Sequence, residues 1–266
     1  MLKRVLSAVM IVLIFVPLLI MGNTIFTVFM SVLGMMSAYE LLKIKDKDGK
    51  IPIIMKLLVY VTVCFMVFYN SSSVTFNYTI DYRFISALVF MFIIPIVLIN
   101  DNKKYSVGTA LYLLAATLFL GFSFNLMVIF RNYDLNYLVY LLLIAVITDS
   151  FAYIGGKLIG RNKMTPNISP NKTWEGAIVG TFMGVFVASS FYHVFINHNY
   201  SLVILILITT MLSVVGQIGD LVFSMIKRHY KEKDFSSLIP GHGGVLDRFD
   251  SIIFIALAFI LVMGIM

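Results

Sequence analysis

The fold is decided by the apolar run at residues 202–226 together with the polar segment that follows it. The run reads LVILILITTMLSVVGQIGDLVFSMI, and residues 224–250 read SMIKRHYKEKDFSSLIPGHGGVLDRFD. A run of this length is expected to cross a bilayer as a helix, because about 20 apolar residues span the hydrocarbon core. Another apolar run begins at residue 249, so the polar segment is predicted to be a loop at a membrane surface.

Composition extends this interpretation to the whole chain. Of the 266 residues, 60% are hydrophobic and only 12% are charged, which excludes an ordinary soluble domain. The sequence predicts an all-α, polytopic membrane helical bundle forming a single domain, with N-terminal helices in 1–135 and catalytic helices and loops in 136–266. We expect about nine transmembrane helices, near residues 5–21, 24–42, 52–70, 84–100, 106–130, 136–156, 174–197, 202–226 and 249–266.

The distribution of Lys and Arg predicts the topology, because short cytoplasmic loops carry an excess of these residues. With the N-terminus in the cytoplasm, 18 of the 20 basic residues fall on the cytoplasmic side, and only Arg83 and Arg131 fall on the other. The loops at 157–173 and 227–248 then share the cytoplasmic face. The net charge of +7 is mainly this topology signal and also suits anionic lipid headgroups, whereas no nucleic-acid-binding module is found.

The polar segment contains three kinds of group that nucleotide phosphates require. It has cations, carboxylates able to hold a divalent metal, and a turn containing Gly241, Gly243 and Gly244. Glycines can adopt backbone conformations in which consecutive N–H groups converge on an anion. Composition alone leaves open a plainer alternative, a basic cytoplasmic loop with a proline-glycine turn.

The order of the residues favours phosphate chemistry. The segment runs Ser-x-hydrophobic-Lys-Arg, then Lys-Asp, then His-Gly-Gly-hydrophobic-x-Asp-Arg-hydrophobic-Asp, and residues 169–176 read SPNKTWEG. Both blocks resemble signatures of the phosphatidate cytidylyltransferases, also called CDP-diacylglycerol synthases. The resemblance implies transfer of CMP from CTP to phosphatidic acid, and it implies a homodimer. The compact form of the chain favours a bacterial cytoplasmic membrane, with an organelle membrane as the alternative, and the distribution of basic residues predicts that the active site faces the cytoplasm.

The resemblance also implies roles for individual residues. Asp220 and Asp247 are expected to contribute to a Mg²⁺ site and, with Lys227 and Arg228, to catalysis. The expected substrate-binding residues are Asp149, Lys172, Ser224, His242, Gly243, Gly244, Arg248 and Asp250.

Spacing gives an independent argument for Asp220. Gln217, Asp220, Ser224 and Lys227 or Arg228 follow one another at intervals of three or four, so they form a polar stripe on an apolar helix. Such a stripe is expected to face partner helices, and the neighbouring glycines would let another backbone or a phosphate approach closely. The alternative for Asp220 is an ion pair that only holds two helices together.

The sequence leaves the roles of several other polar residues open. Asp149 could bind substrate or serve helix packing, and Lys172 could contact phosphate or anchor a helix at the interface. His242 could be a general base, a hydrogen-bond donor to phosphate or a brace for the glycine turn. Asp250 and Glu175 could cap helices, and Glu40 is most simply an interfacial residue.

Two other functions compete with CMP transfer. A secondary transporter would explain the spans and the intramembrane aspartates but not the phosphate-type loop. A CTP-dependent lipid kinase would share most of the chemistry and would release CDP in place of pyrophosphate.

Overall fold

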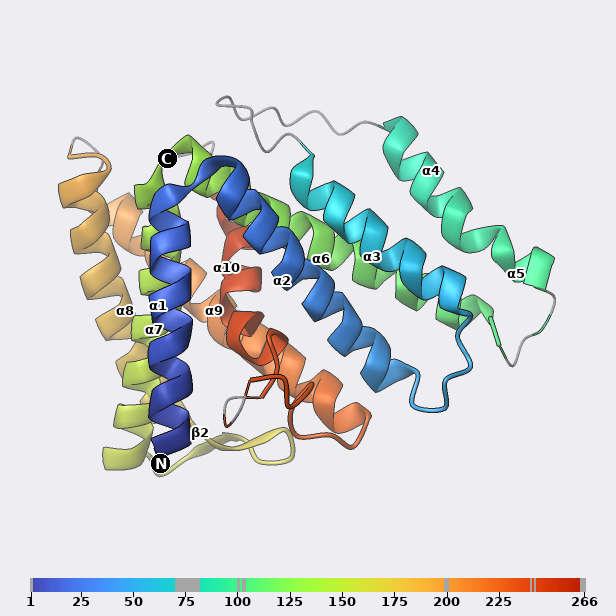
Figure 1. Cartoon of the computed structure of the whole chain (residues 1–266). Coiled ribbons are helices and arrows are strands. Elements are labelled where there is room, and N and C mark those ends of the chain that lie inside the picture. The colour runs from blue at the N-terminus through green and yellow to red at the C-terminus, as the bar shows by residue number, and fades with distance from the viewer. Residues whose placement is uncertain are drawn as a thin grey trace. The chain divides into compact units, whose positions relative to one another are not determined.

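The structure is a computed structural model that describes residues 2–69, 82–99, 101, 104–198, 201–239, 241 and 243–263, with only the backbone at 2–8 and 82. Two compact units make up the chain. Unit 1 consists of Met1–Asn132 and Phe235–Val245, and unit 2 consists of Tyr133–Asp234 and Leu246–Met266. Most described residues lie in α-helices, and the described strands form a single short hairpin (Figure 1).

Unit 1 is built from α1 (Leu2–Met21), α2 (Asn23–Lys45), α3 (Ile53–Phe68), α4 (Tyr82–Ile93), α5 (Pro95–Ile99) and α6 (Val107–Tyr133). A sharp turn at Gly22, with φ of 64°, separates α1 from α2. The Arg131 guanidinium lies where a Gly22 side chain would point and donates to the carbonyl oxygens of Leu19 (2.8 Å) and Ile20 (2.6 Å). Arg131 therefore satisfies carbonyl groups that the end of α1 leaves without helical partners.

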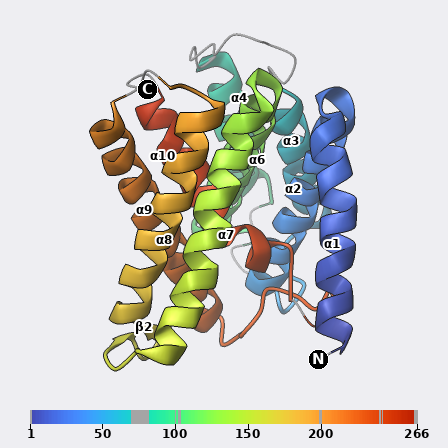
Figure 2. The same cartoon turned by 90° about the vertical axis from the view of Figure 1, so that its left-hand side faces the viewer.

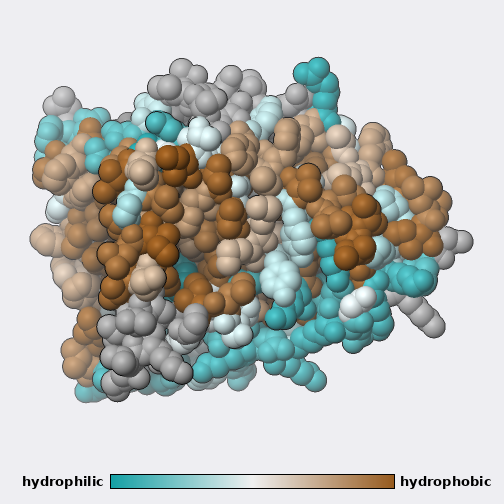
Figure 3. Space-filling model, viewed as in Figure 1, coloured by the Kyte–Doolittle hydropathy of each residue, from teal (hydrophilic) through white to brown (hydrophobic). Residues whose placement is uncertain are grey.

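The loop between α2 and α3 is organised by Asp46. Its carboxylate accepts hydrogen bonds from the backbone N–H groups of Lys50 (2.7 Å) and Ile51 (3.2 Å) and forms an ion pair with Lys56 Nζ at 2.6 Å. In Figure 3 hydrophobic residues cover the sides of α2 and α3, and hydrophilic residues gather at this loop. This distribution is the one expected of helices that lie in lipid with their ends in water.

Unit 2 contains α7 (Leu135–Leu158), the antiparallel strands β1 (Lys163–Thr165) and β2 (Ser169–Thr173), α8 (Trp174–Phe195), α9 (Leu202–His229) and α10 (Leu246–Val262). The side chain of Asp134 caps α7 by accepting from Asn136 N, and Thr173 caps α8 by accepting from Gly176 N. Figure 2 shows α7 and α8 side by side, with the hairpin joining their lower ends. The hairpin is a departure from the all-helical prediction, and it sets the position of Lys172 just before α8.

Helix α8 packs closely on α7 through glycines spaced four apart. A Cβ atom at Gly176 would meet the carbonyl oxygen of Ala152 at 2.5 Å, and one at Gly180 would meet that of Thr148 at 2.5 Å. Gly184 continues the stripe against the Thr148 side chain. Small residues at such intervals let two membrane helices approach until their backbones touch.

Hydroxyl groups add a second link between the helices of unit 2. Tyr140 of α7 shares a hydrogen bond of 2.7 Å with Thr209 of α9, which also accepts one from Ser189 of α8 (3.3 Å). Thr148 and Ser213 form a similar pair between α7 and α9 at 2.8 Å. These groups are buried, so the hydrogen bonds remove the cost of placing hydroxyls among apolar side chains.

The predicted helical segments are all present among the described residues, but the fourth is divided. Pro95 ends α4 at Ile93 and begins α5, because proline disfavours helical geometry in the residue before it. Within the described parts of the chain, five helices are long and apolar enough to cross a membrane, namely α2, α6, α7, α8 and α9. The chain is therefore an α-helical integral membrane protein.

Candidate active site

Lys172 and Asp220 form an ion pair in unit 2. Lys172 Nζ lies 2.5 Å from Asp220 Oδ2, and the two side chains are 27% and 25% exposed. Lys172 is held by β2, one residue before the Thr173 cap, and Asp220 is held by α9, where Ser224 Oγ also donates to it at 3.3 Å. Because both charges remain partly accessible, a ligand can reach either of them.

A second ion pair is more deeply buried. Lys227 Nζ of α9 lies 2.6 Å from Asp247 Oδ1 at the start of α10, and the side chains are only 10% and 3% exposed. Removing one partner of such a pair leaves a buried charge uncompensated, which is strongly destabilising. Lys227 and Asp247 therefore fix the approach of α10 to the end of α9.

Three carboxylates from different helices lie within electrostatic reach of one another. Asp149 of α7, Asp220 of α9 and Asp250 of α10 repel each other. Lys172 and Arg248 attract Asp149, and Lys227 attracts Asp250. Together with Asp247, these residues form what we call the charged cluster: Asp149, Lys172, Asp220, Lys227, Asp247, Arg248 and Asp250. Apart from Lys172 on β2, the cluster residues lie on otherwise apolar helices, where charges are costly and usually functional.

The polar stripe on α9 faces partner helices, as predicted. Gln217 Nε2 donates to Thr181 Oγ1 of α8 at 2.7 Å, and Asp220 and Lys227 reach Lys172 and Asp247. The adjacent glycines also allow a close approach, because Cβ atoms at Gly216 and Gly219 would meet side-chain atoms of α10 at 2.7 Å. The spacing in the sequence thus predicted correctly that this face of α9 contacts neighbouring elements.

Arg228 lies beside the cluster residues in the sequence but has other partners. Its Nε donates to the carbonyl oxygen of Ile168 in the β1–β2 hairpin at 3.2 Å, and Nη1 donates to that of Glu232 at 3.0 Å. Arg228 thus ties the end of α9 to the hairpin. Binding a phosphate with this guanidinium requires it to exchange one of these carbonyl partners.

The glycine turn belongs to unit 1 and closes on itself. Gly241 and Gly243 have φ values of 79° and 86°, which glycine adopts without strain. Ile239 and Gly243 exchange both backbone hydrogen bonds, at 2.9 and 3.2 Å, and Val245 N donates to Glu40 Oε1 at 2.9 Å. The N–H groups of Gly243 and Val245 are therefore engaged within unit 1, and a phosphate-binding role for Gly243 and Gly244 stays a prediction. His242 lies outside the described residues.

Glu40 is a residue whose importance the sequence analysis missed. This α2 glutamate is fully buried, and its Oε1 accepts hydrogen bonds from Ser236 Oγ (2.6 Å) and Val245 N (2.9 Å). A Cβ atom at Gly244 would collide with the same carboxylate. Glu40 therefore holds both ends of the 235–245 loop. The available signal was a glutamate inside an apolar run, which is costly unless buried donors satisfy it.

The helix-capping alternatives are resolved by the element boundaries. Asp250 lies inside α10, which begins at Leu246, so it does not cap that helix. Glu175 lies in the first turn of α8, and its carboxylate accepts from the backbone N–H groups of Arg161 and Asn162, both at 3.1 Å. Ser251, which the analysis did not single out, donates to Asp149 Oδ2 at 3.1 Å.

The donors of the charged cluster suit a hard cation. Among the described residues, no group of three or more His, Cys, Asp or Glu side chains is arranged to hold a metal ion. Magnesium, however, usually binds through one or two carboxylates and completes its shell with water and substrate phosphates. The oxygen donors of Asp220 and Asp247 fit such a site in their chemistry.

Comparison with known sequences gives a consistent result. A sequence model described as "Cytidylyltransferase family" matches residues 2–266. A Staphylococcus haemolyticus protein named phosphatidate cytidylyltransferase is 35% identical over 253 residues, which is 95% of each chain. Proteins of the same name from Staphylococcus aureus (strain COL) and Bacillus subtilis (strain 168) are 33% and 34% identical, covering 95% of this chain and 95% and 94% of their own.

Proposed function

The chain belongs to the cytidylyltransferase family, and on that premise we propose that it transfers CMP from CTP to phosphatidic acid, giving CDP-diacylglycerol and pyrophosphate. The observation that carries the proposal is the charged cluster, in which the partly exposed Lys172–Asp220 pair adjoins Asp149 on apolar helices. A membrane-embedded site that combines cations and carboxylates suits a reaction between a lipid phosphate and a nucleotide.

The reaction brings two anions together. An oxygen of the phosphatidic acid phosphate attacks the α-phosphorus of CTP, the bond to the β-phosphate breaks, and pyrophosphate leaves. The nucleophile is already anionic, so positioning and charge stabilisation carry most of the catalysis. Lys172, Lys227 and Arg248 supply positive charge at the cluster, and Arg228 joins them if it releases a carbonyl partner.

Mg²⁺ is the proposed cofactor, held by Asp220 and Asp247. When bound, it neutralises charge on phosphate oxygens. Lys172 and Lys227, which pair with these aspartates, hold the two carboxylates in place. Lys172 and Lys227 lie directly beside these carboxylates. A nucleotide whose phosphates bind the metal at this site would therefore also contact the two lysines.

The proposed setting is the cytoplasmic membrane of a bacterium, with nine spans, the N-terminus inside and the active site facing the cytoplasm, where CTP is available. The 18 basic residues assigned to that side support this orientation. The product stays in the bilayer, so the site has to open to both water and lipid. The family resemblance further supports a homodimer.

The test is a label-transfer assay with purified protein in lipid nanodiscs containing phosphatidic acid, Mg²⁺ and CTP labelled at the α-phosphate. We expect label in the lipid phase and equimolar pyrophosphate in solution. Asp220→Asn should reduce the transfer by at least ~100-fold, because it removes a proposed Mg²⁺ ligand and the carboxylate that positions Lys172.

Asp48→Asn is the matched control. Asp48 is 67% exposed and pairs only with Lys50 in the α2–α3 loop, so its loss should leave transfer unchanged. Full activity of a folded Asp220→Asn protein would refute the site, and release of CDP in place of pyrophosphate would indicate a lipid kinase.

A further inference from the structure

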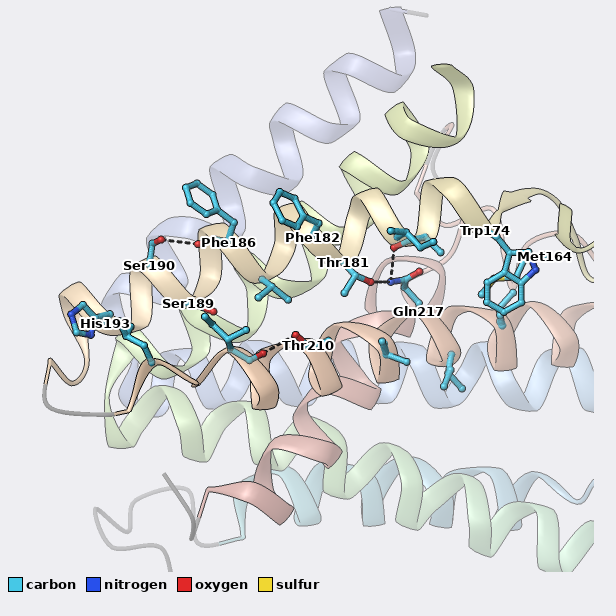
Figure 4. Close-up of a pocket in the computed structure, with 18 of the residues that line it drawn as sticks. Met164, Trp174, Thr181, Phe182, Phe186, Ser189, Ser190, His193, Thr210 and Gln217 are labelled. Carbon is cyan, nitrogen blue, oxygen red and sulfur yellow. Dashed lines mark hydrogen bonds between the residues drawn. The ribbon is translucent and has the colours of Figure 1, made fainter. Parts of the chain in front are cut away.

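An open cavity of about 830 Å³ runs along α8 and α9 of unit 2 (Figure 4). Its walls are almost entirely apolar, and Phe182 and Phe186 line its α8 side. The main polar group near its middle, the Gln217 amide, is already bonded to Thr181 Oγ1 at 2.7 Å and to the Ala177 carbonyl oxygen. The cavity therefore suits a hydrocarbon ligand, because its wall offers few hydrogen-bonding groups that require water.

One end of the cavity adjoins the charged cluster. Trp174 and Leu221 line this end, and they lie two residues after Lys172 and one residue after Asp220. A molecule with its phosphate at Lys172 can therefore extend a chain directly into the cavity. From Leu221 the α9 lining continues to Leu202, nineteen residues or about 28 Å at 1.5 Å per residue, so the cavity follows the helices along most of the roughly 30 Å hydrocarbon core.

The side chains around the cavity favour a lipid chain over a second helix. Ile178, Phe182 and Phe186 are 67%, 70% and 63% exposed and project from α8 along one side. Helices that associate in membranes prefer small residues at their contacts. The small residues of α8 are already used within unit 2, because Gly176 and Gly180 pack against α7 while Thr181 and Ser189 hydrogen-bond to α9.

We propose that the α8–α9 cavity binds an acyl chain of the phosphatidic acid whose phosphate lies at Lys172. This assignment rests on the proposed function and adds to it a subsite that recognises chain length. A lipid with short chains engages only the charged cluster, whereas a lipid with long chains also gains the apolar contacts of the cavity.

The test compares two substrates in mixed micelles, dioleoyl and dihexanoyl phosphatidic acid. Val214→Trp fills the cavity from α9, where Val214 is 43% exposed and has room for a larger side chain. We expect kcat/KM for the dioleoyl lipid to fall at least about tenfold, the cost of losing room for a single methylene in an apolar pocket. For the dihexanoyl lipid we expect a change below about twofold.

The matched control is Val203→Trp, the same substitution on the same helix at a residue that is 68% exposed and outside the lining. It should change neither value. Equal losses with both lipids, or no loss with either, would overturn the subsite. A shift from dimer to monomer in native mass spectrometry with unchanged chain-length dependence would also overturn it, because the cavity would then be a subunit contact.

A second variant and the wild-type activity complete the test. If Val214→Trp does not fold, Val214→Phe carries the same comparison with a smaller side chain. Wild-type protein that transfers CMP to neither lipid would refute the proposed function itself. Wild-type protein that accepts both lipids, with the same relative loss for each in the variant, would refute only the acyl-chain subsite.

Discussion

Replacing Glu40 with alanine should release the 235–245 loop of unit 1. The buried carboxylate accepts hydrogen bonds from Ser236 Oγ at 2.6 Å and Val245 N at 2.9 Å. A hydrogen bond to a charged group contributes about 1.5–3 kcal/mol, and a buried N–H left without a partner costs a similar amount. We therefore expect Glu40→Ala to destabilise the loop by on the order of 3–5 kcal/mol, and Ser236→Ala by about 1–2 kcal/mol.

Hydrogen–deuterium exchange measures this directly. The Val245 amide should exchange about 150- to 5,000-fold faster in Glu40→Ala, the change that corresponds to about 3–5 kcal/mol. Glu40→Gln keeps one acceptor oxygen and should fall in between. Ser237→Ala, a change at the exposed neighbouring serine, is the control and should leave exchange at Val245 unaltered. Unchanged exchange in Glu40→Ala would refute the idea that this carboxylate holds the loop.

Two further predictions concern stability. Burial raises the pKa of the Asp46 carboxyl, but its bonds to Lys56 and to two backbone N–H groups outweigh burial and leave the pKa below its ordinary 3.8. Because the pKa of Asp46 is lower in the folded protein than in the unfolded chain, its carboxylate stabilises the fold at pH values above the unfolded-state pKa. The difference in Tm between wild type and Asp46→Asn should therefore be constant near neutral pH and shrink below about pH 4. A difference in Tm that grows in acid would contradict this. Gly180→Ala should lower the free energy of unfolding by about 1–3 kcal/mol, measured by thermal unfolding, because its Cβ would meet the Thr148 carbonyl oxygen at 2.5 Å. Gly108→Ala is the control and should have no such effect, because the nearest atom to its Cβ lies at 3.8 Å. Equal effects of the two substitutions would argue against close α7–α8 packing.

Sequence periodicity predicted the helices and the polar face of α9 because both depend on local spacing. The interval from Gln217 to Lys227 places polar groups on one face of a helix whatever surrounds it. The break before Pro95 was also visible in the sequence, since proline constrains the residue that precedes it, but the prediction treated the run as one span.

The partners of the charged residues could not be predicted in the same way. Asp247 lies 20 residues after Lys227, and Asp220 lies on a different element from Lys172, so only the packing of the helices brings the charges together. Glu40 is separated from Ser236 by 196 residues, which is why a single glutamate in an apolar run gave no indication of the loop that it holds. The roles of the glycines on α8 likewise depend on the position of α7.

The bond from Arg131 to the end of α1 also constrains the order in which unit 1 can be completed. Leu19 and Arg131 are 112 residues apart, so the ribosome makes the acceptor long before the donor. At roughly 5–20 residues per second, about 6–22 seconds pass between them. Throughout that interval the α1–α2 turn has to keep its conformation without the hydrogen bonds from the Arg131 guanidinium. The α1–α2 pair therefore reaches its final form only after α6 has been synthesised.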